Sequence, residues 1–137
     1  MDGTMLTPVL VLASWTLVMM IWMYATRIPA MGRAGIDAKL MKEKSEMEVL
    51  PRAVRQVADN YNHLHEQPVV FYALAFYCHL AGTADAINLG LAWAYVGLRI
   101  AHSLFQALVN FVPLRFALFS LSALCLGVMV VRNLLAL

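Results

Sequence analysis

Ionisable and amide side chains recur at helical spacing in a short stretch that ends at a proline. Their positions, i, i+4, i+7 and i+11, share one face of a helix, and the residues are Arg55, Asp59, Asn62 and Glu66. The stretch 68–80 that follows is too short to cross a hydrocarbon core of about 30 Å by itself. A spanning helix here must draw part of the polar column into the membrane. Ionisable groups are costly there, so the column is a candidate binding site.

A second polar stripe repeats this pattern further along the chain. Its members stand at i, i+3, i+7 and i+11, and they are Arg99, His102, Gln106 and Asn110. Arg115 follows at the start of the next apolar run. Arginine binds carboxylates through two parallel hydrogen bonds and stays charged when desolvated, so the two stripes can hold a small anionic or zwitterionic ligand. The alternative is that Arg99 pairs with Glu66 or Asp59 only to let the helices pack.

Other chemistries fit the spacing less well. His63 and His65 lie about 200° apart on a helix, so they cannot share a metal ion, and we expect no metal site. Ser103 adjoins His102 and points away from it, which argues against a nucleophilic serine. The net charge is only +2 with acids and bases mixed, so no nucleic-acid partner is expected.

Composition indicates a membrane protein with a single domain over residues 1–137. The chain is 62% hydrophobic and only 13% charged, and its mean hydropathy is +0.72. Cys78 and Cys125 sit in apolar runs, where a thiol behaves as a small hydrophobe. We therefore expect membrane lipid to surround most of the chain.

Four spans are expected, which makes the fold an all-α, up-down-up-down four-helix bundle. Residues 6–26 form a retained first span, and Pro29, Gly32 and Gly35 are expected to break any continuing helix. The other expected helices cover residues 51–80, kinked at Pro68, then 84–109 and 116–131. Seven of the ten Lys and Arg residues lie between Arg27 and Arg55, which predicts a cytoplasmic loop over 27–50 and both termini outside.

Three stretches resemble the MAPEG family, the membrane-associated proteins of eicosanoid and glutathione metabolism. They are NYNHLHEQPVVFY at 60–72, LRIAHS at 98–103 and NFVPLRF at 110–116, and the chain is most similar to small bacterial members. The resemblance implies four-helix protomers that assemble as a homotrimer in the bacterial inner membrane. Glutathione would bind between neighbouring protomers near the cytosolic side.

The resemblance also implies roles for individual residues. The family's Arg…Asn-x-x-Glu pattern is similar to Arg55, Asn62 and Glu66, although here the last interval is four residues, so Asn60 and His65 remain alternatives. The family's Arg-x-x-His matches Arg99 and His102, and the arginine that activates the glutathione thiol, thirteen residues after that histidine, matches Arg115. Gln106 stands where transferases of the family have a tyrosine. The implied glutathione-binding residues are Arg55, Asn62, Glu66, Arg99, His102 and Gln106, with Arg115 catalytic.

The resemblance implies a glutathione transferase or peroxidase that uses glutathione as co-substrate and a hydrophobic electrophile from the bilayer. One alternative is a non-catalytic relative that binds glutathione or lipid. A channel subunit is a third interpretation, but the first and last expected spans lack polar stripes. The polar residues gather at one depth, which favours a pocket open to the cytoplasm over a pore.

Overall fold

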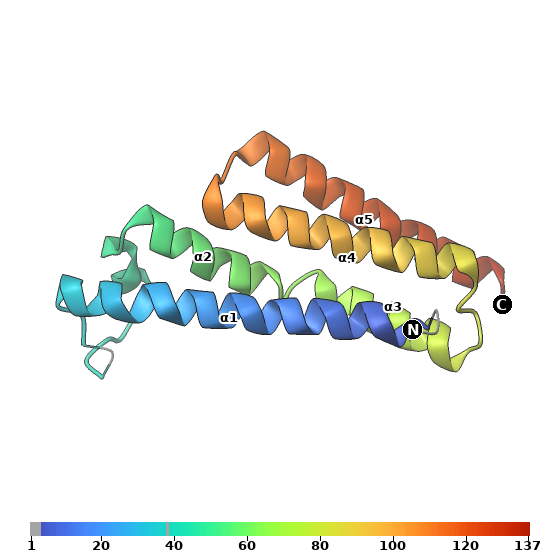
Figure 1. Cartoon of the computed structure of the whole chain (residues 1–137), viewed down its shortest axis with the longest axis horizontal. Helices are drawn as coiled ribbons and strands as arrows, with labels where there is room; N and C mark the ends of the chain where they lie inside the picture. The colour runs from blue at the N-terminus through green and yellow to red at the C-terminus, as the bar shows by residue number, and fades with distance from the viewer. Residues whose placement is uncertain (1–3, 38) are drawn as a thin grey trace.

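A computed structural model describes residues 4–37 and 39–137 of the chain as helices joined by turns (Figure 1). No strand occurs in these described residues. The elements are α1 (Leu6–Ala34), the 3-10 helix η1 (Lys44–Val49), α2 (Arg52–His63), α3 (Pro68–Leu80), α4 (Ala86–Leu108) and α5 (Val112–Leu135). The all-helical prediction is confirmed for this part of the chain.

Helix α1 is longer than predicted. It continues through Pro29 and Gly32 as far as Ala34, so the expected break after residue 26 is wrong. A proline inside a helix removes one backbone hydrogen bond, but the turns on both sides of Pro29 remain helical, and the next residue, Ala30, is buried. Gly35 ends the helix in the left-handed region with φ of 70°, and its N–H donates to the Gly32 carbonyl oxygen at 3.3 Å.

The helix predicted over 51–80 is two helices, α2 and α3, separated by a turn over residues 64–67. Pro68 has no N–H to donate, and its ring would clash with the carbonyl of a continuing helix four residues earlier. The proline instead takes a place in the first turn of α3, where the missing N–H costs nothing. Glu66 therefore lies in the turn, outside the helical face that carries Arg55, Asp59 and Asn62, and the single column predicted from spacing is wrong.

Helices α1 and α5 are long and apolar enough to cross a membrane, with 29 and 24 residues. They are the two helices of the described chain that meet this criterion. Their outward faces carry exposed aliphatic side chains such as Leu10, Ile21 and Leu124. The number of spans and their orientation stay predictions.

The helices pack in pairs (Figure 1). Helix α1 runs alongside α2 and then α3, while α4 and α5 lie side by side in opposite directions, and α2 contacts α4. Between them lies a core that includes Met19, Phe71 and Met129, none of which is exposed. This arrangement sets the turn between α2 and α3 against the polar stripe of α4.

The opposite end of the structure is closed by a polar network around the start of α4. Asp85 caps α4 by accepting a hydrogen bond from the Asn88 N–H at 2.8 Å, and it pairs with Arg132 of α5 at 2.7 Å. Thr83 donates to the side-chain oxygen of Asn133 at 2.7 Å. These contacts fix the α3–α4 turn to the end of α5, far along the helices from the polar stripe.

Candidate functional site

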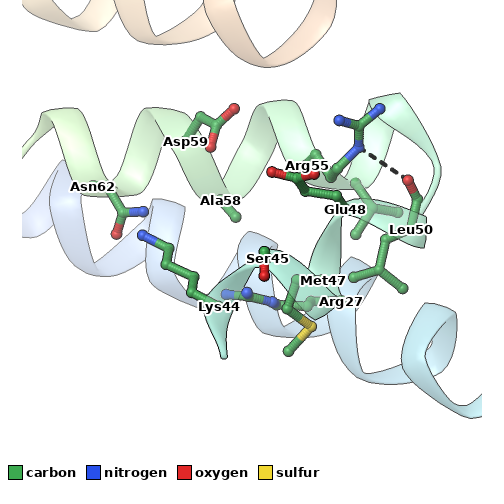
Figure 2. A pocket seen from close by; sticks show the side chains of 11 residues that line it. Arg27, Lys44, Ser45, Met47, Glu48, Leu50, Arg55, Ala58, Asp59 and Asn62 are labelled. Atoms are coloured by element: carbon green, nitrogen blue, oxygen red, sulfur yellow. Dashed lines mark hydrogen bonds between the residues drawn. The ribbon is translucent and has the colours of Figure 1, made fainter. Parts of the chain in front are cut away.

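The predicted site residues line two separate hollows. One, of about 310 Å³, has six polar lining residues, namely His63, Glu66, Gln67, Arg99, His102 and Arg115. Its remaining lining is apolar and comes from the first turns of α5, at Val112, Phe116 and Phe119. We call this the Arg99 hollow. The other, of about 320 Å³, lies among α1, η1 and α2, and we call it the loop hollow (Figure 2).

Arg99 is the most unusual residue of the Arg99 hollow, because it is charged and only 1% exposed. Its Nη2 donates to the carbonyl oxygen of His63 at 3.4 Å, while Nε and Nη1 are buried without a partner among the described residues. Its guanidinium carbon also lies 5.9 Å from the centre of the Phe119 ring. A buried guanidinium left in this condition costs free energy, so the hollow is suited to an anion that supplies the missing acceptors.

The alternative was that Arg99 forms a structural ion pair with Glu66 or Asp59. The described part of the chain contains no such pair. There the one ion pair within 4.0 Å joins Arg132 to Asp85, at the opposite end of α4. Glu66 is exposed, and it lines the same hollow as Arg99 without forming an ion pair with it.

Helix α4 positions Arg99 because of what precedes it in the sequence. Asp85 starts the helix by capping it, and Tyr95, one turn before Arg99, is fully buried. The Tyr95 ring stacks on Phe71 of α3 with ring centres 4.7 Å apart. This contact fixes the rotation of α4 against α3, so the arginine one turn later points toward the break between α2 and α3.

His102 lies one turn after Arg99 and is 2% exposed. Its ring stacks on that of His63 at 6.3 Å between centres and lies 6.3 Å from the Phe119 ring. Its Nδ1 has no partner among the described residues. The imidazole therefore keeps a free hydrogen-bonding position at the wall of the Arg99 hollow.

Arg115 lies in the first turn of α5, next to a turn that depends on Asn110. Asn110 adopts the left-handed region with φ of 54°, which asparagine tolerates better than most residues. Its side-chain oxygen accepts a hydrogen bond from Arg115 Nη1 at 2.5 Å, while the buried Arg115 Nε has no partner in the described chain. Asn110, predicted only as part of the stripe, thus orients the arginine that the sequence analysis assigned to catalysis.

Gln106 does not line either hollow. It is 2% exposed, and its side-chain oxygen is buried without a partner among the described residues. Its position on the polar stripe is as predicted, but the structure places it in the interior between helices.

The structure places each of the alternatives left open on the first polar stretch, Asn60 or Asn62 and His65 or Glu66, in a different environment. Asn60 is fully buried and donates to the Ser103 hydroxyl, so its amide is used between α2 and α4. His65 is exposed and its Nδ1 lies 2.9 Å from the carbonyl oxygen of Tyr61. Of the four candidate residues, Asn62 lines the loop hollow and Glu66 lines the Arg99 hollow.

The loop hollow holds the other predicted ligands, Arg55 and Asn62, together with Arg27, Lys44 and Asp59. Arg55 donates through Nε to the carbonyl oxygen of Leu50 at 3.0 Å, and Lys44 of η1 reaches toward Asn62 in Figure 2. Within one copy of the chain, the predicted glutathione-binding residues therefore do not converge on a single hollow.

The lining of the Arg99 hollow includes three residues that were not predicted from the sequence, His63, Gln67 and Phe119. The signal that could have identified Gln67 is its place directly before Pro68, because a helix break turns that residue out of the regular column. His63 and Phe119 have no comparable signal, since their positions depend on how α2 and α5 are rotated.

Comparison with known proteins places the chain in a family. The family model described as "MAPEG family" matches residues 5–135. Comparisons with curated proteins and with solved structures returned no match. Among the described residues no three His, Cys, Asp or Glu side chains are grouped so that they could hold a metal ion. The match covers nearly the whole chain and agrees with the two apolar helices, so this membrane protein belongs to the MAPEG family, whose functions relate to glutathione and eicosanoids.

Proposed function

We propose that the protein is a membrane-embedded, glutathione-dependent transferase or peroxidase that acts on a hydrophobic electrophile at the cytoplasmic side of the bilayer. One observation carries the proposal. The Arg99 guanidinium is buried with two nitrogens unpartnered, and it lines the same hollow as Arg115 and an apolar wall. Such a hollow suits a ligand that is anionic at one end and reacts with an apolar partner at the other.

Glutathione fits the donors of this hollow. It offers two carboxylates and an ammonium group besides its thiol, so Arg99 can bind a carboxylate and Glu66 can pair with the ammonium group. His102 adds a hydrogen-bonding nitrogen on the same wall. The carboxylates of glutathione would supply the hydrogen-bond acceptors that the unpartnered nitrogens of Arg99 and Arg115 lack.

Arg115 is the proposed activating residue. A free thiol has a pKa of about 8.5 and is mostly protonated at neutral pH, whereas the thiolate is the nucleophile. A fixed guanidinium beside the sulfur stabilises the thiolate, and the released proton passes to solvent. In a transferase the sulfur then bonds to an electrophilic carbon, and the leaving group departs with its electron pair.

The electrophile is proposed to enter from the lipid. Phe116 is 71% exposed and Phe119 is 40% exposed, and both line the Arg99 hollow on the side formed by α5. Exposed aromatic side chains on an apolar helix lie in contact with the acyl chains, so an apolar substrate can reach the hollow without crossing water.

A homotrimer in the bacterial inner membrane is part of the proposal. Because Arg55 and Asn62 line the loop hollow, they can contribute to glutathione binding only if another copy brings its loop hollow to the Arg99 hollow. Native mass spectrometry in detergent tests this assembly, and a stable monomer as the dominant species would contradict it.

Isothermal titration of the purified protein with glutathione tests the central claim. We expect saturable binding, and we expect Arg99→Met to remove most of it. Binding without turnover of any electrophile in a panel of aryl halides, epoxides and lipid hydroperoxides would favour a non-catalytic relative. No binding at all would contradict the proposed function.

A further inference from the structure

We propose that the side-chain amide of Gln67 donates a hydrogen bond to the ligand of the Arg99 hollow and so helps to select a carboxylate there. This inference rests on the proposed function for the identity of that ligand. It concerns a residue that the spacing of charged groups does not reveal, because Gln67 is neutral and stands in the turn before Pro68.

The oxygen of the Gln67 side chain is held by two other helices. It accepts a hydrogen bond from the Tyr95 hydroxyl of α4 at 3.2 Å. It also lies 3.1 Å from the Ser122 hydroxyl of α5, which shares its single proton with the Phe119 carbonyl oxygen at 2.7 Å. Both hydroxyl-bearing residues are fully buried. Gln67 thus joins the α2–α3 turn to α4 and α5 at a single atom.

Fixing the oxygen also fixes the nitrogen, because a carboxamide is planar. The nitrogen Nε2 has no hydrogen-bond partner among the described residues, although Gln67 lines the Arg99 hollow. This nitrogen keeps some exposed surface, whereas the unpartnered nitrogens of Arg99 and Arg115 are covered by neighbouring side chains. The two hydroxyl contacts on the oxygen therefore leave the amide as a donor for the contents of the hollow.

The groups around Gln67 indicate what it would bind. Arg99 contributes two unpartnered nitrogens and Arg115 one, and all of these are donors. They are enclosed, so a ligand reaches them only when the side chains that cover them move aside. Glu66 is the one carboxylate of the lining, and it is exposed. A ligand group facing Arg99 and Gln67 together must accept several hydrogen bonds in a small space, which a carboxylate does and a thiol or an amine does not.

A neutral donor has a specific advantage at this position. A third cation in the hollow would repel Arg99 and Arg115, whereas an amide adds a hydrogen bond without adding charge. Its fixed direction then favours one of the two carboxylates of glutathione over the other.

The test is isothermal titration of the purified full-length protein with glutathione and with its two monoesters, each of which masks one carboxylate. Gln67→Glu keeps an acceptor for Tyr95 and Ser122 but replaces the donor by a negative charge that repels a carboxylate, and we expect it to weaken glutathione binding about tenfold or more. Gln67→Leu should weaken glutathione binding as well, but it should not further weaken binding of the ester that lacks the recognised carboxylate. Gln56→Glu makes the same chemical change on α2 outside both hollows, and it should leave the affinity unchanged.

Each other result overturns a defined part of the proposal. Wild-type protein that fails to bind glutathione overturns the proposed function, and the assigned ligand of Gln67 with it. Wild-type binding that Gln67→Glu leaves intact overturns the Gln67 inference alone. Equal losses for Gln67→Leu on glutathione and on both esters would show a purely structural role. A further result is a higher melting temperature of unliganded Gln67→Glu together with retained glutathione binding. It would show that the side chain at position 67 accepts a hydrogen bond from the Arg99 guanidinium and does not donate one to the ligand.

Discussion

Arg99 of α4 and His63 at the end of α2 are joined by one hydrogen bond, from Arg99 Nη2 to the His63 carbonyl oxygen at 3.4 Å. Helix α2 stops at His63, so the carbonyl oxygen of this residue has no partner within its own helix and accepts from the Glu66 N–H of the following turn at 3.2 Å. A carbonyl oxygen has two lone pairs, and the second is available to Arg99. The break before Pro68 therefore provides the only protein acceptor that Arg99 has in the described structure. The remaining donors of the guanidinium define the candidate binding site.

Replacing Arg99 by Met should separate stability from binding. The methionine has a similar length and no charge to desolvate, so we expect the unliganded protein to be unchanged in stability or more stable by about 1–4 kcal/mol. Glutathione should raise the melting temperature of the wild type in detergent but not that of the variant. Arg33→Met, at an exposed position in the last turn of α1, is the control. Unfolding of Arg99→Met, or an unchanged response to glutathione, would contradict this prediction.

Arg115→Ala should spare the fold and most of the binding but raise the pKa of bound glutathione by about one unit or more, because the guanidinium stabilises only the thiolate. The measurement is the ultraviolet absorbance of the thiolate during a pH titration at saturating glutathione. An unchanged titration curve would exclude Arg115 as the activating group.

Asn110 offers an independent way to disturb Arg115. Asn110→Gly keeps the left-handed backbone but removes the oxygen that holds Arg115 Nη1, so we expect a smaller rise of the thiol pKa in an intact protein. Asn110→Ala removes the same oxygen and adds backbone strain of about 1 kcal/mol, so it should also lower the melting temperature. If Asn110→Gly behaved as the wild type in the thiolate titration, the positioning role of Asn110 would be wrong.

The pH dependence of stability should report on Asp85. The Asn88 N–H and, to a smaller extent, Arg132 hold the pKa of Asp85 below its ordinary value of 3.8. Because the lowered pKa belongs to the folded state, the stabilisation is complete above 3.8 and is lost as the pH falls through the lowered pKa. Melting curves of the wild type and Asp85→Asn should differ at neutral pH and converge in acid. A difference that persists unchanged in acid would contradict this assignment.

The orientation of the chain can be tested by cysteine labelling in intact cells. The protein has two native cysteines, and replacing Cys125 and Cys78 by Ala gives a background for Lys42→Cys and for Leu137→Cys. A membrane-impermeant maleimide added from the periplasmic side should label position 137 and not position 42, because the basic loop is expected in the cytoplasm. Labelling of position 42 under these conditions would reverse the topology.

The sequence determined the helical composition and the shared location of Arg99, His102 and Arg115. Arg99 and His102 lie three residues apart, so any helix through them presents both on one face. Arg115 follows a short turn that forces α5 back along α4, which returns it to the same end of the pair. These relationships are local, and they do not depend on what packs against α4.

Only the tertiary structure decided how the remaining groups are partnered. Periodicity predicted one polar column through Glu66, but the steric demands of Pro68 and the packing of the turn against α4 and α5 divided it between two hollows. The packing of the helices likewise brings the Asn60 amide to the Ser103 hydroxyl, and it places two buried hydroxyl groups next to the Gln67 side-chain oxygen. The physical reason is that contacts between helices depend on their relative rotation and depth, which the summed packing of the whole chain sets and which no interval within one helix encodes.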